Sequence, residues 1–186
     1  MLRSLVGLGD VYKRQTGSWA MLRLASRPEI IEELYEEQVR VYSDGAGGFA
    51  PLDYDTQKSS VPVLDAVIRE TLRMHPPIHS LMRRVKSDMV VPPTLAAPKT
   101  GKGQSTDTYV IPKGHYLVAA PGVSQIDPHV WCDADKFDPH RWLGDKTLID
   151  QTDDAQEDFG WGLVSTGANS AYLPFGAGRH RCIGEQ

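Results

Sequence analysis

Apolar residues recur at helical spacing in a segment that begins near residue 26. Ser26-Arg27-Pro28-Glu29 has the Ser-x-x-Glu spacing of a capping box, with proline placed for the first helical turn. The pattern predicts a helix of several turns that ends before Ser43. The apolar residues that recur at helical spacing are Ile30, Ile31, Leu34 and Tyr35.

A second apolar stripe follows a glycine-rich connection at residues 44–48. Ser60 and Pro62 are typical of a helix start, because serine can cap the first turn and proline is tolerated there. Pro76 and Pro77 cannot continue a helix and therefore end it. The apolar face of this second helix is expected to consist of Leu64, Val67, Ile68 and Leu72.

The hydrophobic period changes after the second helix and predicts a small β part. Residues 81–91 predict a strand, and residues 92–108 predict a loop rich in Pro, Gly, Lys and Thr. Residues 109–120 predict a β-hairpin around Pro112-Lys113-Gly114, with proline second and glycine fourth in a type I turn. The fold class is therefore expected to be mainly α with a small β part.

Regular patterns fade between residues 121 and 170. Asp127-Pro128 and Asp138-Pro139 predict turns. With so much irregular chain, the apolar faces of the two helices are expected to pack against protein outside this segment. An acidic run predicts a solvated surface loop and contains Asp150, Asp153, Asp154, Glu157 and Asp158.

Composition and charge exclude several classes of protein. The 186-residue chain is 40% hydrophobic, and its net charge of -4 leaves no basic surface for nucleic acid. The two cysteines, Cys132 and Cys182, are too few for a disulfide framework, so a reducing compartment is expected. No apolar run is long enough to cross a bilayer and residues 1–9 lack a secretory cleavage site, which predicts a soluble segment.

Residues 1–15 are expected not to be native. Asp10-Val11-Tyr12-Lys13-Arg14-Gln15 is the translation of GAT GTG TAT AAG AGA CAG, which resembles a transposon-end adapter used in sequencing libraries. The alternative is a genuine basic segment, but no helical or strand period supports it. The native reading frame is therefore expected to begin near Thr16.

Two arginines and a carboxylate form the first candidate site. Glu70 and Arg73 share one face of the second helix, where such a pair is usually a surface ion pair. Arg141 belongs to an aromatic, turn-rich stretch, Phe137-Asp138-Pro139-His140-Arg141-Trp142. The second arginine makes a larger cluster possible.

The second candidate site is Cys182, which lies in a glycine-rich loop. Gly176, Gly178 and Gly184 allow backbone N–H groups to turn toward one sulfur and favour a thiolate metal ligand. The common alternative is a buried cysteine that acts as a small hydrophobe. A structural metal module is another alternative, although the spacing of its ligands fits no paired zinc knuckle. Those ligands would be Cys132, His140, His180 and Cys182.

In this order, the motifs resemble the C-terminal part of a cytochrome P-450. Residues 16–186 are expected to form a partial catalytic domain, from the end of the oxygen-activating helix to the haem-cysteine loop, incomplete at both ends. The resemblance implies that Cys182 is the axial thiolate of haem b iron and favours O–O bond cleavage. It also implies a buried cluster of Glu70, Arg73 and Arg141. The further haem-binding residues that it implies are Phe175, Gly178, His180, Gly184 and Arg83.

A narrower resemblance is to the fungal sterol 14α-demethylases of ergosterol biosynthesis, carried by residues 77–83, 109–116 and 172–182. It implies three oxygenations of the sterol 14α-methyl group, which leaves as formic acid. Dioxygen would be the co-substrate, and NADPH would supply electrons through NADPH-cytochrome P-450 reductase. The implied substrate-binding residues are Ile78, His79, Ser80, Leu81 and Met82, although strand core is the alternative for the apolar ones.

The resemblance also implies parts that this segment lacks. A complete enzyme would carry an N-terminal membrane anchor and lie on the cytosolic face of the endoplasmic reticulum membrane. Because the distal wall of the haem pocket is missing, the fragment is expected to be inactive alone. Another microsomal cytochrome P-450 with a different substrate is the alternative enzyme.

Overall fold

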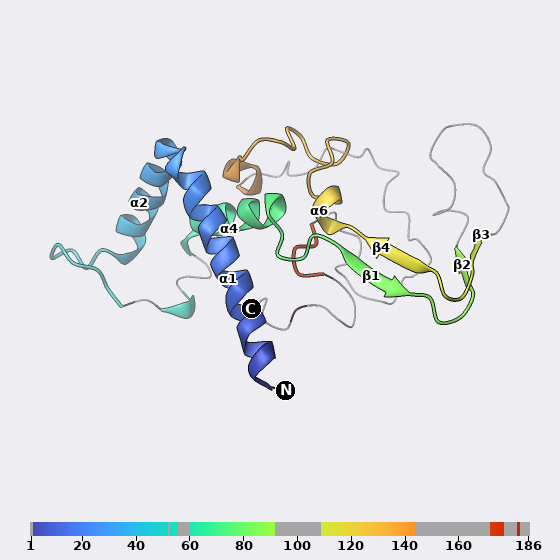
Figure 1. Cartoon of the computed structure of the whole chain (residues 1–186). Helices are drawn as coiled ribbons and strands as arrows, with labels where there is room; N and C mark the ends of the chain where they lie inside the picture. Colours follow the sequence, from blue (N-terminus) through green and yellow to red (C-terminus); the bar gives the residue numbers. More distant parts are fainter. Residues whose placement is uncertain are drawn as a thin grey trace.

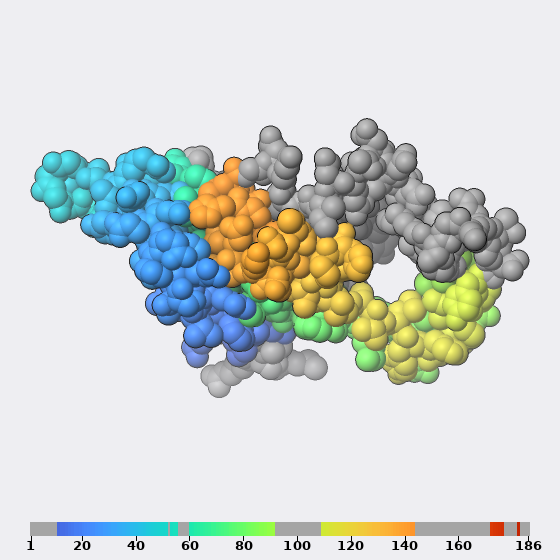
Figure 2. Space-filling view, turned by 90° about the horizontal axis from the view of Figure 1, so that it is seen from above, coloured from blue at the N-terminus to red at the C-terminus, as the bar shows by residue number. Residues whose placement is uncertain are grey.

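The computed structural model describes residues 2–51, 53–55, 60–91, 109–143, 172–176 and 182. Helices form a body at one end, and a long β-ribbon projects from it (Figures 1 and 2). The described part is mainly α with a small β content, as the sequence predicted. In chain order the elements are α1 (Leu2–Ala25), α2 (Pro28–Tyr42), α4 (Pro62–Met74), β1 (Leu81–Arg84), β2 (Met89–Val91), β3 (Tyr109–Ile111), β4 (Tyr116–Ala119), α6 (Pro121–Ser124) and the 3-10 turn η1 (Pro139–Trp142).

Helix α1 begins at Leu2, well before residue 16, where the resemblance implied the end of the oxygen-activating helix. Its first half has no apolar stripe, so the hydrophobic period gave no signal there. The helical conformation of this half does not decide its origin, and the expectation that residues 1–15 are not native stays a prediction. Among the described residues, no helix combines the length and apolarity needed to cross a bilayer.

Helix α2 begins without the capping box that was predicted at Ser26 and Glu29. Its N-cap is Arg27, and no side chain caps it. The Ser26 hydroxyl donates instead to the Arg23 carbonyl at 3.0 Å, because α1 ends next to it and offers a nearer acceptor. Proline in the first turn and the end before Ser43 are confirmed.

Helix α4 is capped by a side chain from α2 rather than by Ser60, so that prediction was wrong. Its N-cap is Val61, which has no side-chain acceptor. The Glu37 carboxylate accepts from the backbone N–H groups of Val63 at 2.7 Å and Leu64 at 3.0 Å. Glu37 is only 1% exposed, so a buried negative charge lies at the positive end of α4.

The buried face of α4 differs from the predicted one. Val67 packs with Ile30 of α2 and with Phe137 in the core of the helical body. Ile68, which was expected in the core, is 44% exposed. One residue further along an α-helix turns away by about a quarter of a turn, and the inward direction is taken by Glu70 and Arg73 instead. The predicted end before Pro76 is confirmed.

The β strands pair differently from the predicted hairpin. Residues 81–91 form two short strands rather than one, and β3 does not pair with β4. Strand β1 pairs antiparallel with β4, and β2 pairs antiparallel with β3. Both pairs lie along one ribbon (Figure 1), so residues 81–91 run back along residues 109–119. Pairing of residues 109–119 with residues 81–91 is favoured over a local hairpin because it satisfies more backbone N–H and C=O groups.

The turn in this ribbon also differs in type. The His115 N–H donates to the Pro112 carbonyl at 3.3 Å, so Gly114 is third rather than fourth in the turn. Its φ of 95° is a left-handed conformation that glycine adopts without steric cost. Glycine third, with positive φ, is typical of type II and not of type I.

The Glu37 cap generates a stability prediction. We expect Glu37→Ala to lower the free energy of unfolding by about 1–2 kcal/mol, because two partly buried N–H groups of α4 lose their acceptor. Chemical denaturation measures the change. Glu36→Ala is the matched control, since Glu36 is exposed on the same helix, and an equal loss in both variants would contradict the cap.

Candidate functional site

Glu70 and Arg73 form a buried bidentate ion pair on α4. Arg73 Nε donates to Glu70 Oε2 and Arg73 Nη2 donates to Glu70 Oε1, each at 2.9 Å. Both residues are 0% exposed, so the alternative of a surface ion pair was wrong for them. Inside a protein such a pair persists only when its remaining polar atoms are also satisfied.

Arg141 brings a second positive charge to the same carboxylate. It lies in η1, whose N-cap Asp138 accepts a hydrogen bond from the His140 N–H. Arg141 Nε donates to Glu70 Oε1 at 3.1 Å. The Asp138 N–H and the Trp142 indole N–H also donate to Glu70, each at 3.0 Å. The structure therefore brings Glu70, Arg73 and Arg141 together and leaves no oxygen of the carboxylate without donors.

The remaining guanidinium N–H groups bind backbone carbonyls of residues 125–136. This loop is irregular, and Asp133 has a φ of 47°, which is unusual for a residue other than glycine. The guanidinium groups of the two arginines therefore hold a loop that contains no helix or strand. Arg73 donates to the carbonyls of Gln125 (2.7 Å), Ala134 (2.9 Å) and Lys136 (3.1 Å), and Arg141 to those of Cys132 (2.8 Å) and Asp133 (3.3 Å).

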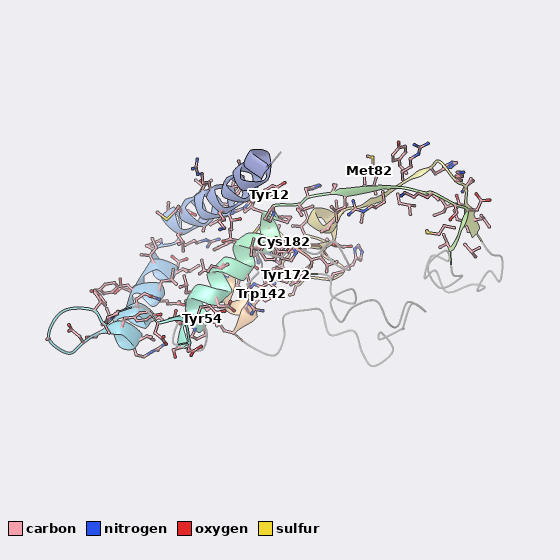
Figure 3. All side chains as sticks on the ribbon, turned by 90° about the horizontal axis from the view of Figure 1, so that it is seen from below. Tyr12, Tyr54, Met82, Trp142, Tyr172 and Cys182 are labelled. Atoms are coloured by element: carbon pink, nitrogen blue, oxygen red, sulfur yellow. The ribbon has the colours of Figure 1, made fainter. Side chains whose placement is uncertain are left out.

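Three aromatic side chains cover this cluster. The Arg73 guanidinium lies 5.4 Å from the ring centre of Trp131, within the range of a cation–π contact. Trp142 and Tyr172 have ring centres 4.8 Å apart. The Tyr172 hydroxyl donates to the Arg69 carbonyl of α4 at 3.3 Å. Figure 3 shows Trp142 and Tyr172 close together, and the Tyr172 hydroxyl fastens this residue to α4.

Residues 172–176 lead toward Cys182. The Cys182 N–H donates to the Phe175 carbonyl at 3.1 Å, which brings these two candidate haem-site residues together. Gly176 has a φ of 75°, as the glycine-rich pattern predicted for this loop. Cys182 is exposed and its thiol is free, so it does not act as a buried hydrophobe in this structure. Gly178, His180 and Gly184 lie outside the described residues, as does the acidic run after residue 149.

The predicted substrate segment is only partly close to the cysteine loop. A side-chain carbon on Gly176 would lie 3.8 Å from Leu81 Cδ1, so Leu81 lies next to the loop. His79 packs closely against Gly122, leaving no room there for a side chain. Met82 is 61% exposed on the β-ribbon, away from Trp142 and Tyr172 (Figure 3). Ile78 is partly buried and Ser80 exposed. Within the described residues, the exposed Arg83 donates to the neighbouring Met82 carbonyl.

Comparison with known proteins decides the family. A family model described as Cytochrome P450 matches residues 15–186. The chain belongs to the cytochrome P450 family. That family implies a haem cofactor. It also agrees with the fold class expected from the sequence, the C-terminal portion of this fold.

Individual relatives are similar over the whole chain. Lanosterol 14-alpha demethylase of Mycosarcoma maydis is 63% identical over 188 residues, which is 100% of this chain and 34% of the relative. Eburicol 14-alpha-demethylase of Uncinula necator is 46% identical over 188 residues, covering 100% of this chain and 33% of the relative. A sterol 14-alpha demethylase of Gibberella zeae is 45% identical over 190 residues, again with 100% and 33% covered. The chain spans about a third of the length of these relatives.

The donor groups on the described residues fit haem better than zinc. A porphyrin brings its own equatorial nitrogens and needs one axial thiolate, which the free Cys182 can supply. A zinc module needs several protein ligands, and within the described residues no group of three or more His, Cys, Asp or Glu could hold a metal ion. His140, a ligand in that alternative, is hydrogen-bonded to Glu33 at 2.7 Å.

Sequence reasoning missed several residues of this site. The indole of Trp142 was marked only as part of an aromatic stretch, and its N–H turned out to bind Glu70. Glu37 gave no signal, because its partner on α4 is 26 positions away. Gln125 is fully buried between α4 and Leu173, yet it stands in a segment without any regular pattern. Long-range bonds to backbone groups leave no mark on hydrophobic periodicity.

Two histidines at the edge of the site have shifted pKa values in opposite directions. Burial, followed by the charges of Arg23 and Arg73, lowers the pKa of His75. Its neutral ring accepts from Arg23 Nε at 3.1 Å and stacks on Trp19 with centroids 3.9 Å apart, joining α1 to the end of α4. The hydrogen bond that the His140 ring donates to the Glu33 carboxylate raises the pKa of His140, with burial opposing and nearby carboxylates assisting.

The His140 contact generates a prediction about pH. Because the pKa is raised in the folded protein, the contact contributes fully below the unfolded pKa and is lost as the pH rises through the folded pKa. We expect NMR titration to place the pKa of His140 above the ordinary 6.5. Glu33→Gln should move it back toward that value. The exposed Glu32→Gln is the control, and an equal effect of both substitutions would refute the pairing.

Proposed function

We propose that this chain is the cysteine-loop part of a fungal sterol 14α-demethylase, a haem-thiolate monooxygenase. The observation that carries the proposal is the 63% identity to a lanosterol 14-alpha demethylase across the whole chain. The buried cluster of Glu70, Arg73 and Arg141 and the free thiol of Cys182 are consistent with it.

In this proposal Cys182 is the axial thiolate, and the charged cluster is the support that holds its loop. Glu70 and the two arginines fix residues 125–136 against α4, and Tyr172 fastens the beginning of the cysteine segment to the same helix. Bound haem would supply activation of dioxygen for insertion into a C–H bond. Further haem-binding residues would be Phe175, which shields the sulfur, with Gly178, His180, Gly184 and Arg83.

The proposed substrate is a 14α-methylated sterol, which would meet the segment between α4 and β1. Leu81 supports this, because its side chain lies beside the loop that carries Cys182. An apolar wall suits a sterol, whose surface is almost entirely hydrocarbon. The other residues proposed to line the pocket are Ile78, His79, Ser80 and Met82.

The proposed reaction is three successive oxygenations of the 14α-methyl group. Each consumes one dioxygen, two electrons and two protons and releases water. The methyl carbon passes through the alcohol and aldehyde levels and leaves as formic acid, with a double bond formed in the sterol ring. NADPH supplies the electrons through NADPH-cytochrome P-450 reductase. In the complete enzyme, an N-terminal anchor would hold the domain on the cytosolic face of the endoplasmic reticulum membrane. The segment alone is expected to be inactive.

The thiolate assignment is tested by Cys182→Ser in the complete enzyme that contains this segment. We expect the reduced carbonyl complex to lose the red-shifted Soret band that a thiolate gives, and sterol demethylation to stop. Cys132→Ser is the matched control, because Cys132 is the other exposed free cysteine. Retention of spectrum and turnover by the Cys182 variant would rule out the proposed ligand. A wild-type enzyme with a normal haem spectrum but without sterol turnover would point to another microsomal cytochrome P-450.

The supporting role of the cluster is tested by Arg73→Ala. The change leaves Glu70 as a buried carboxylate with one partner fewer, which costs roughly 3–5 kcal/mol. We expect the variant to incorporate no haem, as measured by the Soret absorbance of purified protein. Arg69→Ala is the control, since Arg69 is an exposed arginine of the same helix paired with Asp65. Normal haem content in the Arg73 variant would refute the role.

A further inference from the structure

Gln125 is a buried polar residue to which the proposed function gives no role. It follows α6, at the junction between the β-ribbon and the loop of residues 125–136. Its side chain is 0% exposed. A buried amide has to place both its N–H groups and its oxygen in hydrogen bonds, so its position reports which segments it joins.

The amide nitrogen of Gln125 binds the end of α4. Nε2 donates to the Leu72 carbonyl at 3.1 Å and to the Arg73 carbonyl at 2.9 Å. These carbonyls belong to the last turn of the helix, where no intrahelical N–H remains to satisfy them. Gln125 therefore caps α4 at its C-terminal end from a position more than fifty residues later in the chain.

The amide oxygen of Gln125 binds the segment that carries the cysteine. Oε1 accepts from the Leu173 N–H at 2.8 Å. Leu173 is followed by the buried Pro174 and by Phe175, whose carbonyl accepts from the Cys182 N–H. One side chain thus connects the helix of the charged cluster to the backbone that leads to the sulfur.

Gln125 is itself held by the cluster, because its backbone carbonyl accepts from Arg73 Nη1 at 2.7 Å. Its own N–H donates to the Pro121 carbonyl at 2.9 Å, which fixes the turn after α6. The backbone of Gln125 is thus anchored before its side chain reaches Leu173. A displacement of Arg73 would therefore move the Gln125 amide and with it the cysteine segment.

We propose that Gln125 is a positioning residue for the Cys182 loop, acting through the Leu173 N–H. This inference rests on the proposed function, since it takes Cys182 as the axial thiolate. Glutamine makes both sets of hydrogen bonds at once. Asparagine is one methylene too short to span α4 and Leu173, and glutamate keeps only the bond to Leu173, because it has no N–H for the two α4 carbonyls.

The experiment uses the complete holoenzyme and compares Gln125→Met with Thr71→Val. Methionine keeps the length of glutamine and removes all three hydrogen bonds. Thr71 is equally buried on α4, and its hydroxyl donates to the Val67 carbonyl within the same helix. Thr71→Val therefore removes a buried hydrogen bond but leaves the link between α4 and Leu173 intact. The readouts are the fraction of the reduced carbonyl complex with the thiolate Soret band and the rate of haem transfer to apomyoglobin.

We expect haem transfer roughly tenfold faster in Q125M than in the wild type, because the partly buried Leu173 N–H and two carbonyls of α4 lose their partners. The thiolate Soret band should give way in part to the band of haem without a thiolate ligand. T71V should lose stability but keep the wild-type spectrum. If Q125M does not accumulate as holoenzyme, Q125N replaces it and should shift both readouts in the same direction.

Gln125→Glu separates the hydrogen bonds of the amide nitrogen to α4 from the hydrogen bond of the amide oxygen to Leu173. Glutamate keeps an oxygen for the Leu173 N–H and loses the donors to α4, so we expect a thiolate fraction nearer to the wild type than that of Q125M. An equal loss in Q125E and Q125M would overturn the proposal, as would a Q125M spectrum and transfer rate equal to those of T71V. A wild-type enzyme without a thiolate Soret band would overturn the proposed function instead.

Discussion

The structure depends on one carboxylate, that of Glu70, buried where water cannot solvate its charge. A buried ion of this kind is stable only when every lone pair has a donor. Those donors come from α4 itself, from η1 and from the N-cap residue Asp138 of η1, so two segments distant in sequence have to meet. The ion pair therefore specifies an arrangement more than it adds net stability. The loss of any one partner leaves the others in an unfavourable environment.

The arrangement around Glu70 also positions the segment that leads to Cys182. Among the described residues, 172–176 belong to no helix or strand, so they cannot be placed by a regular ladder of their own. Tyr172 is tied to α4 by its hydroxyl, and Leu173 is tied to it through Gln125. Phe175 then passes the restraint to Cys182 through a single backbone hydrogen bond. Side chains that satisfy backbone groups thus hold a cysteine segment that belongs to no helix or strand.

Local patterns predicted the parts of the fold that local physics decides. The α2 and α4 helices, their proline starts and their ends follow from periodicity and from the geometry of proline. The motif order of Glu70, Arg73, Arg141 and Cys182 also identified the family before any geometry was known. Ile68 failed as a core residue, and the hairpin failed as a pair, because each was decided by a partner far away in sequence. Gln125 and Glu37 could not be found for the same reason, since their bonds end on main-chain atoms of any residue type.

Helix α4 is finished at both ends by side chains that belong to other segments, Glu37 at its start and Gln125 at its end. Glu37 has already been synthesised when α4 leaves the ribosome. Gln125 lies 53 residues after Leu72, whose carbonyl it binds. During synthesis the N-terminal end of this helix can be capped early, whereas its C-terminal carbonyls wait for their partner until much later residues emerge. The helix that carries Glu70 and Arg73 should then become stable first at its N-terminal end and later at its C-terminal end, and the cysteine segment should dock last.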